Sequence, residues 1–477
     1  MITFLLSVAL LIGGYFLYGS FVERIFGIDK NRKTPAYTCQ DGVDYIPMSW
    51  WKNFLIQFLN IAGLGPIFGA VMGAVYGPAA FLWIVFGSIF GGAVHDYLSG
   101  MLSLRNNGMS LPEIGGKYMG TAFKQCMRAF TLGLMVLVGA VFIAGPAGLL
   151  ANMTPLHLDY TFWCVVIFIY YVLATLLPID KIIGKIYPVF GFALLFMALG
   201  IGVALVWNGA PVPEAIPANL QNMNPDPEKY PLFPMLFISI ACGAISGFHA
   251  TQSPLMARCL KNEAYGRRVF YGAMITEGLV ALVWAAAAMS FFGSVGGLHT
   301  FLMENNNNAA VVVDKIAHGW LGQIGGLLAI FGVIAAPITS GDTAFRSARL
   351  IVADFLGFGQ KAIKNRLMIA VPLFVVGFIL LQVNFDVIWR YFAWSNQTLA
   401  AATLWVVTVY LVLAKKLYWI SLIPAVFMTM VVTVYLIVSP EGLQLPISIG
   451  YMVGSIFTAL VTVLFFVWKR RVRIEEI

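Results

Sequence analysis

Long apolar stretches separated by short polar ones make up most of this chain. A helix needs about 20 consecutive, mainly apolar residues to cross a bilayer, and thirteen stretches approach that length. They fall at about residues 2–22, 54–75, 78–103, 128–149, 160–178, 184–207, 233–256, 269–292, 322–345, 367–383, 388–413, 417–438 and 447–468. The pattern predicts an all-α polytopic membrane protein with about thirteen transmembrane helices.

Two of these stretches are interrupted at membrane depth. The first interruption contains Gly63, Gly65 and Pro66, and the second contains Gly243, Gly247, His249, Thr251, Gln252, Ser253 and Pro254. Gly and Pro weaken a helix, and the backbone groups that they free are tolerated in a membrane only where protein or a cavity satisfies them. Paired interruptions at matching positions of two halves indicate the binding site of a secondary transporter with inverted repeats.

The interrupted stretches are the second and the seventh, so they lie five helices apart. Because five is odd, the second five-helix unit enters the membrane from the opposite side, as an inverted repeat requires. This arrangement resembles the leucine-transporter-like architecture, here with one helix before the core and two after it. The predicted units are residues 1–53 (first helix and cytoplasmic loop), 54–207 (first repeat), 208–232 (Pro-rich outer loop), 233–413 (second repeat) and 414–477 (two helices and a basic tail).

The charge distribution predicts the orientation. Of the 477 residues, 60% are hydrophobic and 10% are charged, against about 25% charged residues in soluble domains. With the N-terminus outside, all of the 29 Lys and Arg residues except Lys229, Lys315 and Arg390 fall on the inner side. The net charge of +8 therefore reflects topology rather than a nucleic-acid partner. The first stretch lacks the basic start and cleavage pattern of a signal peptide, so we interpret it as a membrane helix.

The interruptions supply candidate substrate-binding residues. The N-termini of half-helices present N–H donors and a positive dipole end, which suit a substrate carboxylate. The predicted substrate-binding residues are Asn60, Gly63, Gly65, Gly247, His249, Gln252 and Ser253. Two alternatives stay open: the glycines permit close helix packing, and His249 is a hydrogen-bonded packing residue.

Ionisable residues at membrane depth are candidates for ion coupling. His95 and Asp96 of the third stretch, with Glu277 of the eighth, suit a proton relay. Thr339, Ser340 and Asp342 of the ninth stretch offer oxygen ligands for sodium. The structural alternatives are a His95–Asp96 pair, an interhelical hydrogen bond of Glu277, and an Asp342–Arg346 ion pair. We expect protons or sodium to be the coupling ion, with protons favoured.

A short polar patch, Trp394, Asn396 and Gln397, predicts a gate, although it also suits helix packing. A metal site formed by His95, Asp96 and His249 is conceivable, but the spacing is not a known ligand pattern. The five cysteines have no disulfide or metal spacing. We predict neither a metal nor a cofactor beyond the coupling ion.

Five sequence blocks resemble the signatures of the carbon starvation protein A family. They are IAGLGPIFGA (Ile61–Ala70), GGAVHDYLSG (Gly91–Gly100), ISGFHATQSP (Ile245–Pro254), APITSGDTAFRSARL (Ala336–Leu350) and FAWSNQTLA (Phe392–Ala400). The resemblance implies an inner-membrane importer of small nutrients such as peptides and pyruvate. Longer members carry a C-terminal extension that this sequence lacks.

The predicted function is secondary active import of short peptides, driven by an ion gradient. A cavity between two breaks offers donors and carbonyls together, so it suits a peptide carboxylate and amine, whereas pyruvate uses half of it. A pyruvate symporter is the first alternative, and a passive channel or a nutrient sensor is the second. No enzyme motif such as HExxH or GxSxG occurs in a suitable context. The oligomeric state is left without a prediction.

Overall fold

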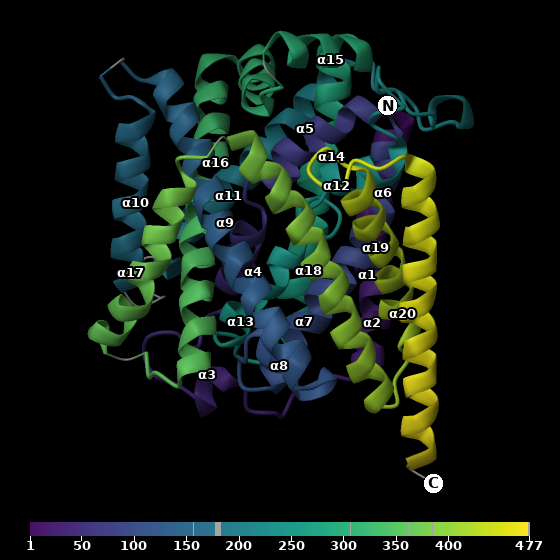
Figure 1. Ribbon diagram of the computed structural model, residues 1–477. Coiled ribbons are helices and arrows are strands. Elements are labelled where there is room, and N and C mark those ends of the chain that lie inside the picture. The colour runs from purple at the N-terminus through teal and green to yellow at the C-terminus, as the bar shows by residue number, and fades with distance from the viewer. Residues whose placement is uncertain (156, 177–182, 306, 361, 384, 476–477) are drawn as a thin grey trace.

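Helices make up most of the chain in this computed structural model, which describes residues 1–155, 157–176, 183–305, 307–360, 362–383 and 385–475 (Figure 1). In chain order the helices are α1 (Ile2–Phe16), α2 (Tyr18–Phe26), α3 (Pro35–Thr38), α4 (Trp50–Ile61), α5 (Ala70–Gly73), α6 (Ala79–Phe86), α7 (Ala93–Arg105), α8 (Leu111–Met119), α9 (Thr121–Met153), α10 (Tyr160–Leu176), α11 (Ile183–Trp207), α12 (Leu232–Ser239), α13 (Gly247–Ala257), α14 (Gly272–Phe291), α15 (Val295–Glu304), α16 (Ala309–Leu356), α17 (Ile363–Leu380), α18 (Phe385–Leu413), α19 (Trp419–Val438) and α20 (Ile447–Glu475).

Ten helices within the described ranges are long and apolar enough to cross a membrane, and an eleventh span is the bent pair Trp50–Ile61 and Gly65–Tyr76. A shorter apolar helix, Tyr160–Ala174, coincides with the fifth predicted stretch. The seventh stretch consists of two short helices, α12 and α13. The all-helical membrane architecture is therefore confirmed, while the number thirteen and the inverted repeat stay predictions.

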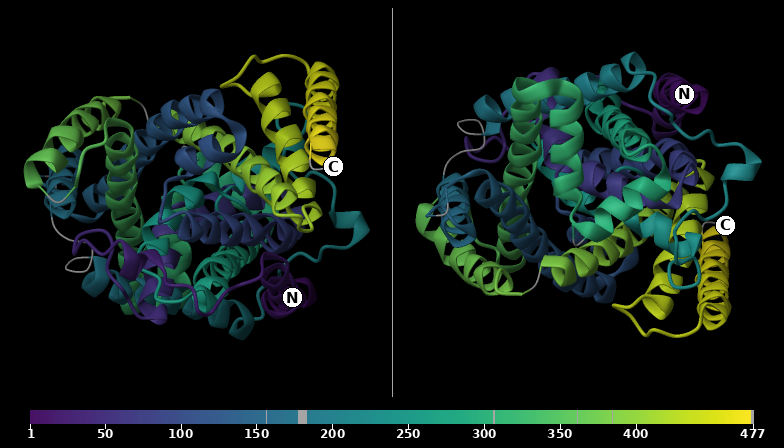
Figure 2. Two further views of the ribbon diagram at one scale, coloured as in Figure 1. Left: turned by 90° about the horizontal axis from the view of Figure 1, so that it is seen from below. Right: turned by 90° about the horizontal axis from the view of Figure 1, so that it is seen from above.

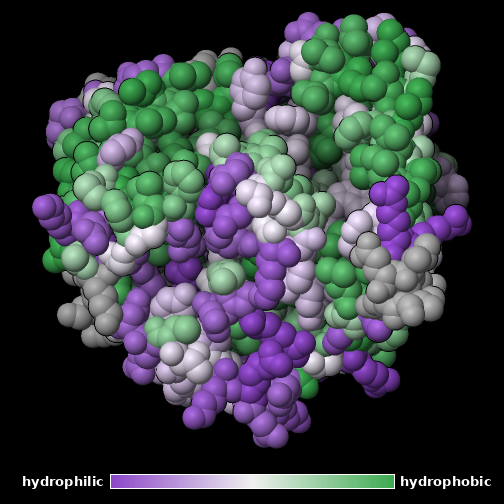
Figure 3. All heavy atoms as spheres, turned by 60° about the horizontal axis from the view of Figure 1, so that its bottom comes forward, coloured by the Kyte–Doolittle hydropathy of each residue, from purple (hydrophilic) through white to green (hydrophobic). Residues whose placement is uncertain are grey.

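The lower end of the molecule carries many polar side chains. The N-terminus and α15 lie at the upper end in Figure 1, and α3, α8 and the C-terminus lie at the lower end. Figure 3 shows hydrophilic side chains gathered on the lower face, with hydrophobic ones beside them. The clustering of basic loops on this side and its assignment to the cytoplasm stay predictions.

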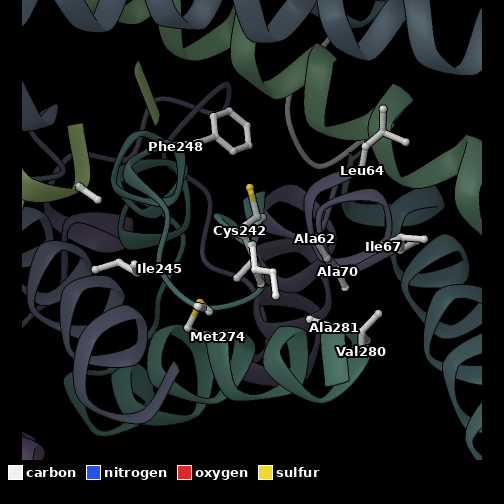
Figure 4. Close-up of a cluster of buried hydrophobic side chains, with 14 of the residues drawn as sticks. Ala62, Leu64, Ile67, Ala70, Cys242, Ile245, Phe248, Met274, Val280 and Ala281 are labelled. Carbon is white, nitrogen blue, oxygen red and sulfur yellow. The ribbon is translucent and has the colours of Figure 1, made fainter. Parts of the chain in front are cut away.

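The C-terminal helices α19 and α20 and the N-terminal α1 lie at the periphery when the molecule is viewed from either end (Figure 2). The centre is formed by the broken segments and by α14, most of whose side chains are buried, including Glu277 and Trp284. A hydrophobic cluster joins both breaks to α14, with Cys242 in the middle of the close-up in Figure 4.

The first break lies where the sequence predicts it. Helix α4 ends at Ile61, and after a bend of 55° the chain continues as Gly65–Tyr76. The segment Gly65–Gly69 at its start is a π-helix that contains Pro66. Glycine and proline at the bend explain the change of direction, because neither supports an uninterrupted α-helix.

The second break lies earlier than the sequence suggests. Residues 240–246 form no helix, and α13 begins at Gly247 and includes His249, Gln252, Ser253 and Pro254. The prediction that these polar residues belong to the interruption is therefore wrong. Proline is tolerated inside membrane helices when neighbouring groups satisfy the freed carbonyl, so Pro254 does not mark the break.

Candidate transport site

Side chains from distant helices satisfy the backbone of the second break. Trp83 Nε1 donates to the carbonyl of Ile240 at 2.9 Å, and Ser88 Oγ donates to that of Gly243 at 3.0 Å. Gln397 Nε2 donates to the carbonyl oxygen of Ile245 at 2.8 Å. These bonds help an unwound segment to persist at membrane depth, because three of its carbonyls accept from side-chain donors.

The N-terminus of α13 is capped by Asn396. Its Oδ1 accepts the N–H of Phe248 at 2.7 Å and the hydroxyl of Ser246 at 2.9 Å. Trp394 Nε1 donates to the carbonyl of Val432 at 3.2 Å. The predicted gate residues Trp394, Asn396 and Gln397 thus make helix-joining contacts, as the packing alternative requires. In this structure a side chain, rather than a substrate, accepts the N–H of Phe248.

The glycines of the two breaks allow close contact. A Cβ atom at Gly65 would overlap Cβ and Sγ of Cys242, so the two breaks touch at this point. A Cβ atom at Gly247 would overlap backbone atoms of Asn396 and Ala400 in α18. At Gly63 it would lie 2.7 Å from the ring of Phe142. The packing alternative therefore describes all three glycines.

Four ionisable side chains form a connected chain in the interior. Asp96 Oδ1 lies 2.7 Å from Nδ1 of His95, and Asp96 Oδ2 lies 2.8 Å from Nδ1 of His249. On the other side of the ring, His249 Nε2 lies 3.3 Å from Glu277 Oε2, without hydrogen-bond alignment. All four side chains are fully buried. We call this set, contributed by α7, α13 and α14, the His–Asp–His–Glu chain.

The local structure places Asp96 at the start of α7. A π-helix, Gly87–Gly92, directly precedes this helix, and π-helices are frequent at functional sites. Asp96 lies in the first turn of α7, which continues α6 and the π-helix as one helical span, Ala79–Arg105. The structure thus brings the predicted coupling residues His95, Asp96 and Glu277 together with His249, which the sequence assigned to the substrate site.

The residues weighed for a metal site do not present free nitrogens toward one centre. His95 and His249 both use Nδ1 for Asp96. A different grouping, Cys242, His249 and Glu277, places one ligand-type atom of each residue within 4.8 Å of the others. The sequence did not single out Cys242, because a lone cysteine in an apolar stretch has no motif around it.

A cavity of about 1080 Å³ leads from the upper end to the two breaks. Its mouth is formed by the loop before α12 and by α15, through residues such as Lys229 and His299, and its inner wall includes Gly65 and Cys242. The predicted outer loops thus lie over the cavity. Of the predicted substrate residues, Gly65 belongs to the lining; Asn60, Gly63, Gly247, His249, Gln252 and Ser253 lie deeper in the protein.

The cavity wall carries charges of both signs. Arg390 Nε lies 2.9 Å from Glu441 Oε1, and the hydroxyl of Tyr435 donates to Glu441 Oε2 at 3.1 Å. Lys229 and Asp226 add a second pair of opposite charges to the lining. The sequence missed this wall, although Arg390 and Lys229 are two of the three basic residues that it assigned to the outside.

Several amide groups of α4 and α13 have unpaired atoms. Both side-chain polar atoms of Asn53 and of Asn60, together with Oε1 of Gln57 and of Gln252, have no hydrogen-bond partner in the described part of the protein. All four side chains are fully buried. A buried polar group left unpaired costs about 1–3 kcal/mol of stability, so these amides destabilise the fold in this conformation.

The candidate sodium ligands mostly bind backbone. Ser340 Oγ donates to the carbonyl of Leu59 in α4 at 3.0 Å, and Thr339 Oγ1 donates to that of Ala336 in its own helix at 2.7 Å. Asp342 accepts a hydrogen bond of 2.7 Å from the hydroxyl of Tyr187. Ser340 thus joins α16 to the last turn of α4, next to the first break, and a sodium role for these residues stays a prediction.

At the lower end, Asp44 holds the segment before α4 against α16. It accepts from Arg346 Nη1 at 3.1 Å and lies 3.4 Å from Arg349 Nη2, and all three side chains are buried. Burial raises the pKa of Asp44, but Arg349, Arg346 and Arg258 lower it more, so the pKa lies below its ordinary value. We call these contacts the Asp44 latch. Loop residues such as Asp44 carry no periodicity that the sequence could reveal.

The motif blocks can now be compared with known proteins. A family model described as carbon starvation protein CstA matches residues 1–155, 147–321 and 295–435. The chain belongs to this family. Membership places this CstA-family chain among membrane transporters and confirms the resemblance of the five blocks.

The relatives differ in the activity that their names state. A Haemophilus influenzae protein, described as an uncharacterized membrane protein, is 46% identical over 340 residues, which cover 61% of the CstA-family chain and 91% of the relative. The peptide transporter CstA of Bacillus subtilis is 26% identical, and the match covers 88% of this chain and 87% of the relative. The pyruvate/proton symporter BtsT of Escherichia coli is 28% identical, and the match covers 59% of this chain and 48% of the relative.

The fold is shared with solved transporters. A crystal structure of a manganese transporter mutant from Eremococcus coleocola superposes with a TM-score of 0.53 at 14% identity. The superposition covers 90% of this chain and 97% of the manganese transporter chain. Similarity at this level of identity concerns the fold alone.

Proposed function

We propose that this protein is a secondary active transporter that imports short peptides together with protons. The observation that carries the proposal concerns Cys242. This residue connects the His–Asp–His–Glu chain to a large cavity whose wall carries charges of both signs. Cys242 lines the cavity, and its sulfur lies within 4.8 Å of ligand-type atoms of His249 and Glu277. A substrate at the breaks is thus one residue away from four ionisable groups.

The size and charge of the cavity favour a peptide. Pockets for drug-sized ligands measure about 300–1,000 Å³, so about 1080 Å³ accommodates a short peptide with some water. A peptide carries an ammonium group and a carboxylate, and the Arg390–Glu441 pair offers a partner to each. The names of several relatives, such as the peptide transporter CstA of Bacillus subtilis, agree with this choice.

Pyruvate is the second candidate. It is supported by the name of the pyruvate/proton symporter BtsT, a relative that matches over part of its length. Pyruvate lacks an amine, so it would use Arg390 or Lys229 and leave the acidic groups of the wall without a ligand. The cavity volume of about 1080 Å³ is also larger than pyruvate requires.

Protons are the favoured coupling ion. The His–Asp–His–Glu chain offers consecutive groups that exchange protons, and histidine titrates near neutral pH. Thr339 and Ser340 donate their hydroxyl hydrogens to backbone carbonyls and keep the oxygen lone pairs that sodium would need, so sodium is the second candidate. We place the protein in the bacterial inner membrane with the N-terminus outside, because the positive-inside rule then accounts for nearly all Lys and Arg residues.

The test is uptake into proteoliposomes that contain the purified protein. We expect saturable uptake of a labelled dipeptide, faster with an imposed pH gradient and unchanged when sodium is omitted. Labelled pyruvate is measured side by side, with each compound competing against the other. Saturable pyruvate uptake that excess dipeptide leaves untouched would reverse the order of substrates, and uptake that is indifferent to both ion gradients would favour a channel.

A further inference from the structure

The unpaired amides lie in a row on one face of α4. Asn53, Gln57 and Asn60 follow the spacing i, i+4, i+7, which places them on the same side of a helix. Gln57 Nε2 donates a long hydrogen bond of 3.4 Å to Ser253 Oγ of α13. We call Asn53, Gln57 and Asn60 the amide row. Gln252 of α13 does not belong to it, because its Nε2 donates to Ser347 Oγ of α16 at 3.5 Å. The amide row starts at the lower end of α4 and stops one residue before the first break.

The amide row continues the line of the outer cavity. The cavity ends at Gly65 and Cys242, on the upper side of the breaks, and Asn60 stands on the lower side of the first break. The cavity thus lies on the upper side of the breaks, whereas the side chains of the amide row below them are fully buried.

We propose that the contact between α4 and α13 is the inner half of the transport route, and that the amide row binds the passing substrate when these helices separate. This proposal rests on the transport function proposed above. Membrane proteins accept buried, unpaired amides at a loss of stability, and such a loss is typical of positions that serve function rather than folding. In the separated state water and substrate would satisfy these groups.

Neutral amides suit a release path. Each amide carries a donor and an acceptor, so the row can follow both the carboxylate and the ammonium group of a peptide. Without a full charge it holds neither group tightly, and a substrate can leave. A row of Lys or Asp side chains would retain one end of a zwitterion.

Two ties just before the start of α4 show what has to open. The N–H of Met48, just before α4, donates to the carbonyl of Cys259, just after α13, at 3.0 Å. The Asp44 latch holds the same segment against α16. Between these ties and the first break, Gln57–Ser253 is the side-chain hydrogen bond that joins the two helices in the described residues.

The experiment compares Asn53→Leu and Gln57→Leu with Asn106→Leu as the matched control. Asn106 is a buried amide whose two ends are bound: Nδ2 donates to the carbonyl of Leu102 at 2.8 Å, and Oδ1 accepts from Lys117 at 2.7 Å. Three quantities are measured on the full chain: the thermal midpoint in detergent, equilibrium binding of a labelled dipeptide, and its uptake into proteoliposomes. If the wild type transports pyruvate instead, labelled pyruvate replaces the dipeptide.

We expect Asn53→Leu and Gln57→Leu to keep or raise the thermal midpoint, to bind the substrate as the wild type does, and to lose uptake by about tenfold. Asn106→Leu should lower the thermal midpoint. Wild-type uptake by both amide-row variants would overturn the proposal, as would a loss of uptake accompanied by the same destabilisation as in Asn106→Leu. A wild type that binds and transports neither compound would instead refute the proposed substrates.

Discussion

Asp96 and His249 are joined by a hydrogen bond of 2.8 Å between Oδ2 and Nδ1, and this bond determines that Nε2 of the imidazole faces Glu277. A carboxylate on α7 thereby sets the orientation of a histidine that stands 153 residues later in the chain. The bond connects the two sides of the His–Asp–His–Glu chain, so the coupling role that we propose for the chain depends on it.

The first prediction concerns Asp96→Asn. The amide keeps an acceptor but removes the charge, and hydrogen bonds to charged groups contribute about 1.5–3 kcal/mol. We expect uptake to fall by about tenfold to a hundredfold and to lose its acceleration by a pH gradient. Proteoliposome uptake with and without the gradient measures both effects. Replacing the exposed His157 by Asn is the control, and an Asp96→Asn variant that still responds fully to the gradient would contradict the coupling role.

The second prediction concerns the contact of Gly65 with Cys242. A methyl group at Gly65 overlaps the Cys242 side chain, and overpacking of this kind costs about 1–3 kcal/mol. We expect Gly65→Ala to reduce uptake strongly and the double variant Gly65→Ala, Cys242→Gly to recover most of it, because the volume is restored. Gly13→Ala, where the added methyl group meets no atom within 4 Å, is the control. A double variant as inactive as Gly65→Ala would argue against this contact.

The third prediction separates Gly247 from Gly65. A Cβ atom at Gly247 meets backbone atoms of α18, which cannot move as a side chain can. We therefore expect Gly247→Ala to lower the thermal midpoint in detergent, and Gly247→Leu to yield little folded protein. Size-exclusion profiles and thermal unfolding provide the measurement. Normal stability of Gly247→Leu with lost uptake would return Gly247 to the substrate site.

The fourth prediction concerns the Asp44 latch. Replacing Asp44 by Asn leaves the buried Arg346 and Arg349 without their carboxylate, a change that typically destabilises by about 3–5 kcal/mol. The pKa of Asp44 is lowered in the folded protein, so its stabilisation is complete above the unfolded pKa of about 3.9 and is lost as the pH falls through the lower, folded value.

Thermal midpoints recorded from pH 7 downward test this prediction. The wild type should lose stability below about pH 4, whereas Asp44→Asn should start lower and lose less over the same range. Equal acid sensitivity of the two proteins would show that other carboxylates govern the acid response.

The sequence predicts the broken helices well because Gly and Pro act locally. Gly65 and Pro66 stand in the bend itself, so their effect on the backbone is direct. The second break was displaced in the prediction because Pro254 is accommodated inside α13, whereas residues 240–246 are unwound through bonds from Trp83, Ser88 and Gln397. Such bonds join residues about 150 positions apart, and a single sequence gives no sign of them.

The candidate site was predicted in its chemistry but not in its grouping. The rule that ionisable residues at membrane depth are functional selected His95, Asp96 and Glu277 correctly as buried groups. The sequence grouped His249 with His95 and Asp96 only in the metal-site alternative, and it gave no sign that Cys242 stands between them and the cavity. Those relationships depend on how α7, α13 and α14 cross, which hydrophobic periodicity leaves open.

The capped second break has a mechanical consequence. Because α6, the π-helix before α7, and α18 all donate side-chain hydrogen bonds to residues 240–246, the unwound segment is fastened to a rigid body made of these helices. The flexibility that an unwound segment suggests is therefore absent here. The first half of the other broken helix, α4, is joined to α13 by one long side-chain bond and to α16 through Ser340, so under the proposal above it is the part that would move against this frame.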